Sequence, residues 1–139
     1  MGKSPKEYLR QIRLFDICIR QKEAELAAMR SELENMSAAV NGERVQTSAK
    51  DKMSEKVSHI VDLEAMIIQD KEKFLRMKDR IINEIQSLDN AVYVDILYKR
   101  YVEYMRLEEI AVRLNYSYDW ARHLHGLALE AFRKSKSPR

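Results

Sequence analysis

Apolar residues recur every seven positions over the first two-thirds of the chain, and this spacing most constrains the fold. Seven residues make almost two full helical turns, so such a series forms a continuous seam that needs a partner helix. Ser4 and Pro5 supply a start signal, because serine caps a helix and proline suits its first turn. The spacing therefore predicts a long helix from Pro5 to about Val40. Its seam contains Tyr8, Ile12, Phe15, Ile19, Leu26, Met29, Leu33, Met36 and Val40.

A second series of the same spacing predicts another long helix, from Met53 to Leu88. Residues 38–52 break the periodicity and contain Asn41-Gly42, a strong turn signal, so they are predicted to form a loop. The two helices can fold back as an antiparallel hairpin or pair with a second copy of the chain, and the sequence leaves both arrangements open. The second series is Met53, Ile60, Ile67, Phe74, Ile81 and Leu88, widened by the neighbouring Val61, Ile68, Leu75 and Ile82.

Residues 1–88 are accordingly predicted to form a helical hairpin or coiled coil that sets the oligomeric state. One facing helix rarely covers both edges of a stripe as wide as that of the second helix. The sequence therefore predicts a hairpin that also self-associates, most simply as a two-fold dimer. The candidate oligomerisation residues are Ile12, Phe15, Ile19, Leu26, Met29, Leu33, Ile68, Leu75 and Ile82.

The C-terminal third has the pattern of a helix-turn-helix domain, predicted over residues 89–134. Asn90 can cap a third helix running to about Tyr104, and a short amphipathic helix follows from Leu107 to Leu114. Asn115 tolerates the left-handed conformation that a tight turn needs. Ser117 can cap a last helix that runs to about Lys134, and residues 135–139 are predicted to be a frayed basic tail.

Positive charge is concentrated in this third. The chain carries a net charge of +3, but the segment from Leu97 to Arg139 has nine lysines and arginines against five acidic residues. Such a distribution is typical of phosphate contacts, although a basic C-terminus also serves solubility alone. In a helix-turn-helix the first turns of the second helix enter the major groove of DNA. The domain is therefore predicted to bind double-stranded DNA.

The candidate DNA-binding residues divide by role. Tyr118, Arg122 and His123 are predicted to approach bases, whereas phosphate contacts position the protein without specifying sequence. Trp120 suits a base contact and a core or partner contact equally well, and Asp119 can instead complement the dipole of the helix N-terminus. His125 is predicted to be a packed, hydrogen-bonded core histidine. The candidate phosphate contacts are Arg113, Arg133 and Lys134.

Catalytic and metal-binding motifs are not evident in the sequence, so no enzyme activity, metal or cofactor is predicted. There is no glycine-rich phosphate loop, paired-cysteine signature or nucleophile elbow. Cys18 is the only cysteine, which favours a reducing compartment, and its apolar neighbours predict a buried structural thiol. No apolar run approaches the length of a membrane span. A cytoplasmic protein is expected.

The segment from Ile96 to Lys134 resembles the region-four domain of bacterial sigma factors. The resemblance rests on residues 97–101 with 107–111, on Tyr116-Ser117, and on Ala128-Leu129 with Phe132-Arg133. Within that class the chain looks most like phage and prophage proteins of the ArpU and RinA type, described as late-gene transcriptional regulators. Closer still is a phage family with a long helical N-terminal half, which the chain resembles at residues 43–46, 52–53, 62–64 and 122–129.

This resemblance implies an all-α phage transcriptional regulator, an activator of phage genes, working in the cytoplasm of a bacterial host. Host RNA polymerase is an implied partner. Two alternatives remain open from the sequence. A small terminase-like packaging subunit can also join a helix-turn-helix to helical oligomerisation, and a helical protein-binding adaptor could keep the helix-turn-helix shape without binding DNA.

Overall fold

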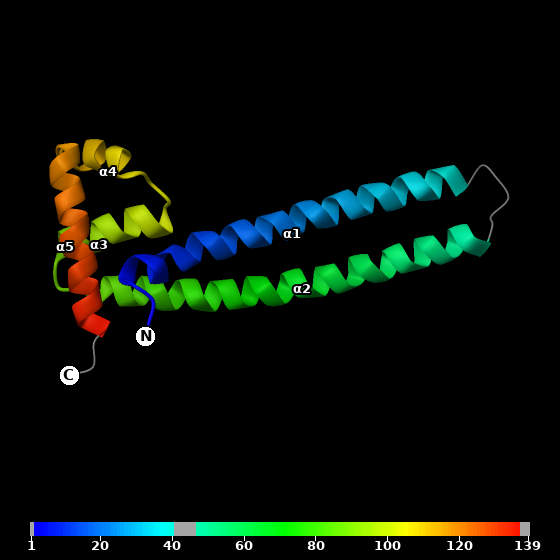
Figure 1. Cartoon of the computed structure of the whole chain (residues 1–139), viewed down its shortest axis with the longest axis horizontal. Coiled ribbons are helices and arrows are strands. Elements are labelled where there is room, and N and C mark those ends of the chain that lie inside the picture. Colours follow the sequence, from blue (N-terminus) through cyan, green and yellow to red (C-terminus); the bar gives the residue numbers. More distant parts are fainter. Residues whose placement is uncertain (1, 41–46, 137–139) are drawn as a thin grey trace. The chain divides into compact units, whose positions relative to one another are not determined.

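The computed structural model describes residues 2–40 and 47–136, and within these ranges all regular secondary structure is helical (Figure 1). The predicted all-α class is therefore confirmed. The elements are α1 (Pro5–Val40), α2 (Thr47–Gln86), α3 (Ala91–Leu97), the π-helical turn η1 (Tyr98–Val102), α4 (Leu107–Leu114) and α5 (Tyr118–Lys136).

The chain divides into two compact units. The first contains Met1–Phe15 and Phe74–Arg139, and the second contains Asp16–Lys73. The division differs from the boundary predicted after residue 88, because the start of α1 and the end of α2 supply much of the first unit's core. Both long helices therefore contribute residues to both units.

In the second unit, α1 and α2 run antiparallel and pack on each other along their apolar seams (Figure 1). Lys22 Nζ lies 2.5 Å from Asp70 Oδ2 and Lys71 Nζ lies 3.1 Å from Glu23 Oε2. These pairs link residues on the two edges of the seam. The sequence left open whether the helices pair within or between chains, and here they pair within one chain. The seam contains Leu26, Ile60 and Ile67, flanked by Met29, Leu33 and Leu63.

The first unit has two apolar clusters. The larger joins α1, α2, α3, η1 and α5, so the last helix packs directly on the first. The smaller lies among α3, α4 and α5 and contains Ile96, Met105, Ile110 and Leu124. The larger cluster contains Leu9, Ile12, Met77, Ile81, Ile85, Leu97, Tyr101, Val102, Ala128 and Phe132.

Two predicted helix starts are confirmed by their hydrogen bonds. Ser4 Oγ accepts from the Glu7 N–H at 3.2 Å, and Pro5 is the first residue of α1. Asn90 Oδ1 accepts from the N–H groups of Val92 and Tyr93 at 2.9 and 3.2 Å. Both side chains satisfy backbone donors that the first turn of a helix leaves without partners.

The predicted loop over residues 38–52 was too long. α1 continues to Val40 and α2 begins at Thr47, so residues 38–40 and 47–52 are helical. Extending an existing helix by one residue is far easier than nucleating one, and Ala38, Ala39 and Ala49 favour extension. The Asn41-Gly42 turn lies outside the described residues.

The predicted third helix does not continue as an α-helix to Tyr104. It widens into η1, where the Glu103 N–H donates to Tyr98 O at 3.1 Å, and it ends before Tyr104, which has a φ of 62°. This wider turn places both Tyr101 and Val102 in the larger core cluster. The left-handed backbone at Tyr104 and the bond from the Met105 N–H to Lys99 O at 2.9 Å then end the helix.

The predicted burial of Cys18 was also wrong, because its thiol side chain is exposed. Successive residues on a helix point about 100° apart, so apolar neighbours in sequence do not share one face. Ile19 is buried in the seam, whereas Ile17 is 43% exposed. Cys18 lies on the exposed side with Ile17.

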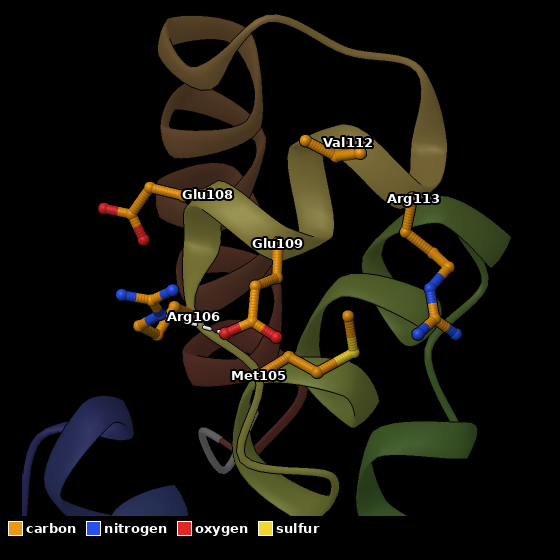
Figure 2. A pocket seen from close by; sticks show the side chains of 6 residues that line it. All are labelled: Met105, Arg106, Glu108, Glu109, Val112 and Arg113. Atoms are coloured by element: carbon orange, nitrogen blue, oxygen red, sulfur yellow. Dashed lines mark hydrogen bonds and ion pairs between the residues drawn. The ribbon is translucent and has the colours of Figure 1, made fainter.

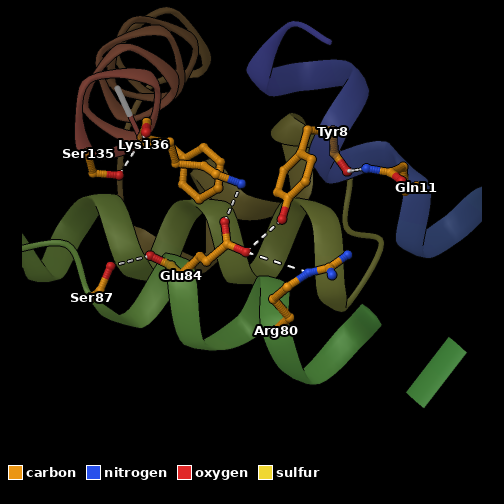
Figure 3. Close-up of polar contacts among 8 residues, drawn as sticks. Tyr8, Gln11, Arg80, Glu84, Ser87, Ser135 and Lys136 are labelled. Atoms are coloured by element: carbon orange, nitrogen blue, oxygen red, sulfur yellow. Dashed lines mark hydrogen bonds and ion pairs between the residues drawn. The ribbon is translucent and has the colours of Figure 1, made fainter. Parts of the chain in front are cut away.

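A polar network fixes the end of α5 to α1 and α2 (Figure 3). Tyr8 Oη donates to Glu84 Oε1 at 2.6 Å, Lys136 forms an ion pair with Glu84, and Lys136 Nζ lies 3.5 Å from the centre of the Tyr8 ring. Burial acts to raise the pKa of Glu84, but the hydrogen bonds from Lys136 and Tyr8 outweigh it and hold the pKa below its usual value. Ser135 and Lys136 are therefore helical, which corrects the tail predicted to begin at residue 135.

Candidate nucleic-acid interface

A three-residue turn joins α4 to α5. Asn115 adopts the left-handed conformation with φ 59° and ψ 41°, as predicted, and the Tyr116 N–H donates to Ala111 O at 2.8 Å. Ser117 Oγ then accepts from the Trp120 N–H at 3.1 Å and caps α5, again as predicted. The turn thus satisfies the last carbonyls of one helix and the first amides of the next.

The first turns of α5 present one apolar face to the protein and a mixed polar and aromatic face to solvent. Ala121 and Leu124 are buried, and Leu124 packs with Ile110 of α4. This packing holds α5 against α4, and among the described residues no element covers the opposite face. The exposed residues of these turns are Tyr118, Asp119, Trp120, Arg122 and His123, all of them candidates from the sequence.

Trp120 is 49% exposed, so it is not a core residue of its own chain. Its ring lies 5.4 Å from that of His123, centre to centre, and the two form a small aromatic surface beside Arg122. Asp119 lies in the first turn of α5, where a carboxylate complements the helix dipole. The surface can therefore offer stacking, hydrogen bonds and one guanidinium to a partner.

Arg113 lies on the outward face of α4, which also carries Glu108 and Glu109 (Figure 2). A surface hollow there is lined by Arg113, Val112 and the two carboxylates of Glu108 and Glu109. Arg106 Nε donates to Glu109 Oε1 at 2.9 Å, and this bond comes first among the causes that hold the Glu109 pKa below its usual value. A phosphate at Arg113 would also meet the carboxylate of Glu109, on which Arg113 acts.

The other two predicted phosphate contacts lie near the end of α5. Arg133 donates twice to Glu130, with Nε to Oε2 at 3.1 Å and Nη2 to Oε1 at 2.5 Å. Lys134 is exposed. A phosphate would therefore share the guanidinium of Arg133 with a carboxylate, which weakens its attraction.

His125 is buried and hydrogen-bonded, as the sequence predicted. Its Nε2 lies 2.8 Å from Tyr101 Oη, and the two rings lie 5.7 Å apart. Burial lowers the pKa of His125 to about 4, and the positive charges of Arg100, Lys6 and Arg10 act in the same direction. Burial likewise raises the pKa of Tyr101. Both groups are therefore neutral at neutral pH and join α5 to η1.

This buried histidine predicts a specific dependence of stability on pH. In the unfolded chain the histidine pKa is about 6.5, above the value of about 4 in the folded protein. Between these values the unfolded state binds more protons, so stability falls as the pH drops from 6.5 towards 4. Substituting His125→Gln should remove this contribution. We expect the urea midpoint to fall less between pH 7 and pH 4.5 in the variant than in the wild type, and equal falls would contradict the assignment.

The predicted oligomerisation residues fall into two groups. Ile12, Ile19 and Leu26 are buried within the chain, and Phe15, Met29 and Leu33 pack beside the two cores. Ile82 is half-buried and packs against the larger cluster of the first unit. On the same helix, some large side chains remain mostly exposed: Ile68 and Leu75, each 59% exposed, and Val61, 56% exposed.

Sequence reasoning missed a group of cations on the first turns of α1. Lys6, Arg10 and Arg13 are exposed in the first unit, on a helix that was assigned to oligomerisation alone. Their spacing of four and three residues places them on one helix face, and that spacing was the available signal. Arg13 Cζ lies 5.5 Å from the centre of the Tyr104 ring, so this face reaches the segment that follows η1.

The described residues give no sign of a metal site or of a membrane-spanning helix. Over residues 2–40 and 47–136, no three histidine, cysteine or acidic side chains gather as metal ligands would. No helix in these ranges combines the length and the apolar character that crossing a membrane requires. Searches of the known protein families, the curated proteins and the solved structures found no significant match to this chain.

Proposed function

We propose that this chain binds double-stranded DNA, with the first turns of α5 in the major groove. The observation that carries the proposal is the junction of α4 and α5. A left-handed Asn115 and a Ser117 cap close one helix and start the next within three residues, as in helix-turn-helix proteins. The helix that follows presents exposed polar and aromatic side chains in the turns that contact base edges in such proteins.

In this proposal Arg122, His123 and Tyr118 approach the bases. Arginine can donate two hydrogen bonds to guanine, and tyrosine and histidine can donate to base edges or to phosphates. The ring of Trp120 lies tilted against that of His123, and it can contact a base or a sugar. Arg113, Arg133 and Lys134 contact phosphates. The carboxylate of Glu109 acts on Arg113, and that of Glu130 acts on both Arg133 and Lys134, so each of these contacts competes with an acidic group of the chain.

The proposal predicts the effect of replacing Arg122 and His123 by alanine together. A good bidentate base contact is worth roughly 1–3 kcal/mol of discrimination. The duplex is selected from a random pool with the wild-type protein. We expect the double variant to bind this duplex about ten-fold more weakly than the wild type does. Anisotropy of a labelled duplex measures this, with circular dichroism as a check on helix content.

A matched control uses the same two residue types elsewhere. His59 and Arg76 are exposed on α2, so the variant with both replaced by alanine loses the same groups and the same charge. We expect it to bind like the wild type. If both double variants bind the selected duplex as tightly as the parent, Arg122 and His123 do not read DNA.

We also propose that the protein forms a two-fold dimer through the exposed face of α2. In the second unit, Val57, Val61 and Ile68 are 44–59% exposed on this helix, although its opposite seam is covered by α1. The positions of Val61 and Ile68 repeat at seven residues, as in helices that pair, and Leu75 in the first unit continues the series. A two-fold dimer suits an operator with two half-sites.

The resemblance to the ArpU and RinA type extends the proposal to a phage transcriptional regulator that activates phage genes and contacts host RNA polymerase. A small terminase-like subunit would instead form a ring of many copies, which the mass in solution distinguishes from a dimer. A protein-binding adaptor would show no salt-dependent retention on DNA of any sequence. Mapping of binding sites in a phage-carrying host tests the regulatory role directly.

A further inference from the structure

The first three turns of α1 carry a face of positive charge in the first unit. Residues 2–15 contain Lys3, Lys6, Arg10 and Arg13 against a single acidic residue, Glu7. Lys6, Arg10 and Arg13 lie within about 60° of one another around the helix axis, and all three are exposed. These cations therefore lie outside the apolar seam from which the helix was predicted.

The same helix is firmly attached to the domain that carries α5. Leu9 and Ile12 are fully buried in the larger cluster, and the Tyr8 ring lies 5.9 Å from that of Phe132. The cationic face flanks these anchors, so its position is fixed relative to α5. It belongs to the same compact unit as α4 and α5.

A fourth cation approaches this face from η1. Arg100 Nη1 donates to Met105 O at 3.1 Å, and its Cζ lies 5.8 Å from the centre of the Tyr101 ring. Arg13 lies over the ring of Tyr104, which follows Tyr101 by three residues in the sequence. Arg100, Lys6 and Arg10 also act on the pKa of His125, which places their charges around the same buried pair.

The patch adjoins the proposed reading helix through this pair. His125 lies one turn after Arg122 on α5, and its hydrogen bond to Tyr101 brings α5 against the segment that carries Arg100. Lys6 and Arg13 are about 10 Å apart along the axis of α1. Measured along the axis of a duplex, that length corresponds to about three phosphates of one DNA strand at 3.4 Å per nucleotide.

We infer that Lys6, Arg10 and Arg13, with Arg100, form a second phosphate-binding surface that holds the DNA backbone beside the segment read by α5. The inference rests on the proposed DNA binding and adds α1 to the interface. A repeating polyanion fits the surface because its cations are spread along a helix face rather than gathered around one point. Such contacts position the protein and carry no sequence information.

The test compares two triple variants with the same change in net charge. One replaces Lys6, Arg10 and Arg13 by glutamine, which preserves helix propensity. The control replaces Lys50, Lys52 and Lys73 by glutamine, all exposed and on the part of α2 that belongs to the second unit. Binding to a random-sequence duplex is measured by anisotropy from low to moderate salt.

We expect the α1 variant to reduce the slope of log K against log salt by about 2–3. Its affinity at low salt should fall at least ten-fold, whereas the control should match the wild type. If circular dichroism shows that the triple variant has lost helix, Lys6→Gln with Arg10→Gln keeps the Arg13–Tyr104 contact. That double variant should reduce the slope by about 1–2.

The possible failures are distinguishable. A wild type that binds the duplex while the α1 variant keeps the same slope overturns the inference and leaves the proposed function in place. Equal losses in the α1 variant and the control also overturn it, because net charge alone would then explain binding. A wild type without salt-dependent binding overturns both the inference and the proposed function.

Discussion

Replacing Phe132 by alanine is expected to lower the free energy of unfolding of the first unit by about 3–5 kcal/mol. Phe132 is only 1% exposed and belongs to the cluster that joins α5 to α1, α2 and η1. Its ring also contacts that of Tyr8. Truncation leaves a cavity among α1, α2, η1 and α5. Urea unfolding followed by the fluorescence of Trp120, in the same unit, measures the loss.

Leu127 provides the matched control on the same helix, because its side chain is 40% exposed. Leu127→Ala should lower the free energy of unfolding by about 1 kcal/mol or less, since most surface substitutions have small effects. Because Phe132 fixes α5 in place, its variant should also bind DNA more weakly than the Leu127 variant at temperatures where both remain folded. Equal losses of stability in the two variants would contradict the packing described for α5.

Replacing Leu26 by aspartate is expected to destabilise the second unit by at least about 3 kcal/mol. Leu26 is 8% exposed in the seam with Ile60 and Ile67. The substitution removes apolar burial and places a carboxylate in the seam, where the cations one turn away on α1, Lys22 and Arg30, already pair with Asp70 and Glu64. Thermal unfolding by far-ultraviolet circular dichroism checks this, because the two long helices dominate that signal.

Ile68→Asp introduces the same charge at a residue that is 59% exposed, so it should lower the unfolding temperature much less than Leu26→Asp, by no more than the loss of the dimer accounts for. Under the proposed dimer it should instead shift the sedimenting species from dimer to monomer and weaken DNA binding. A wild type that sediments as a monomer at tens of micromolar would remove the dimer and leave the hairpin. Equal unfolding temperatures for the Leu26 and Ile68 variants would contradict the seam itself.

Local signals determined much of the secondary structure. Ser4, Asn90, Ser117 and Asn115 act within three or four residues of their own positions, so each effect can be recognised in the sequence. The seven-residue series likewise predicted two long helices, because periodicity is a property of one helix alone. The burial of His125 followed from its place on the inward face of α5.

The widened turn η1 could not be read in this way, because its residues Tyr101 and Val102 pack with residues of α1 and α2 that lie far away in the sequence. The loop length and the exposure of Cys18 did have local causes, in the alanines that extend both long helices and in the 100° step between Ile17, Cys18 and Ile19. Two apolar stripes run along α2, and the structure covers one of them with α1 and leaves Ile68 exposed. The sequence contained both stripes but no measure of which would pack within the chain.

In the candidate interface, too, some features follow from the local sequence and others depend on tertiary packing. Residues 115–123 form one local motif, and the sequence identified their conformation and their exposed candidates. The cations of α1 lie about a hundred residues away along the chain, and only the packing of Leu9 and Ile12 against Tyr101 and Phe132 brings them beside α5. Sequence alone determined the caps, the periodicity and the turn, because these depend on neighbours within one helix. The tertiary structure decided which surfaces meet, because burial of apolar side chains between distant segments depends on the whole fold.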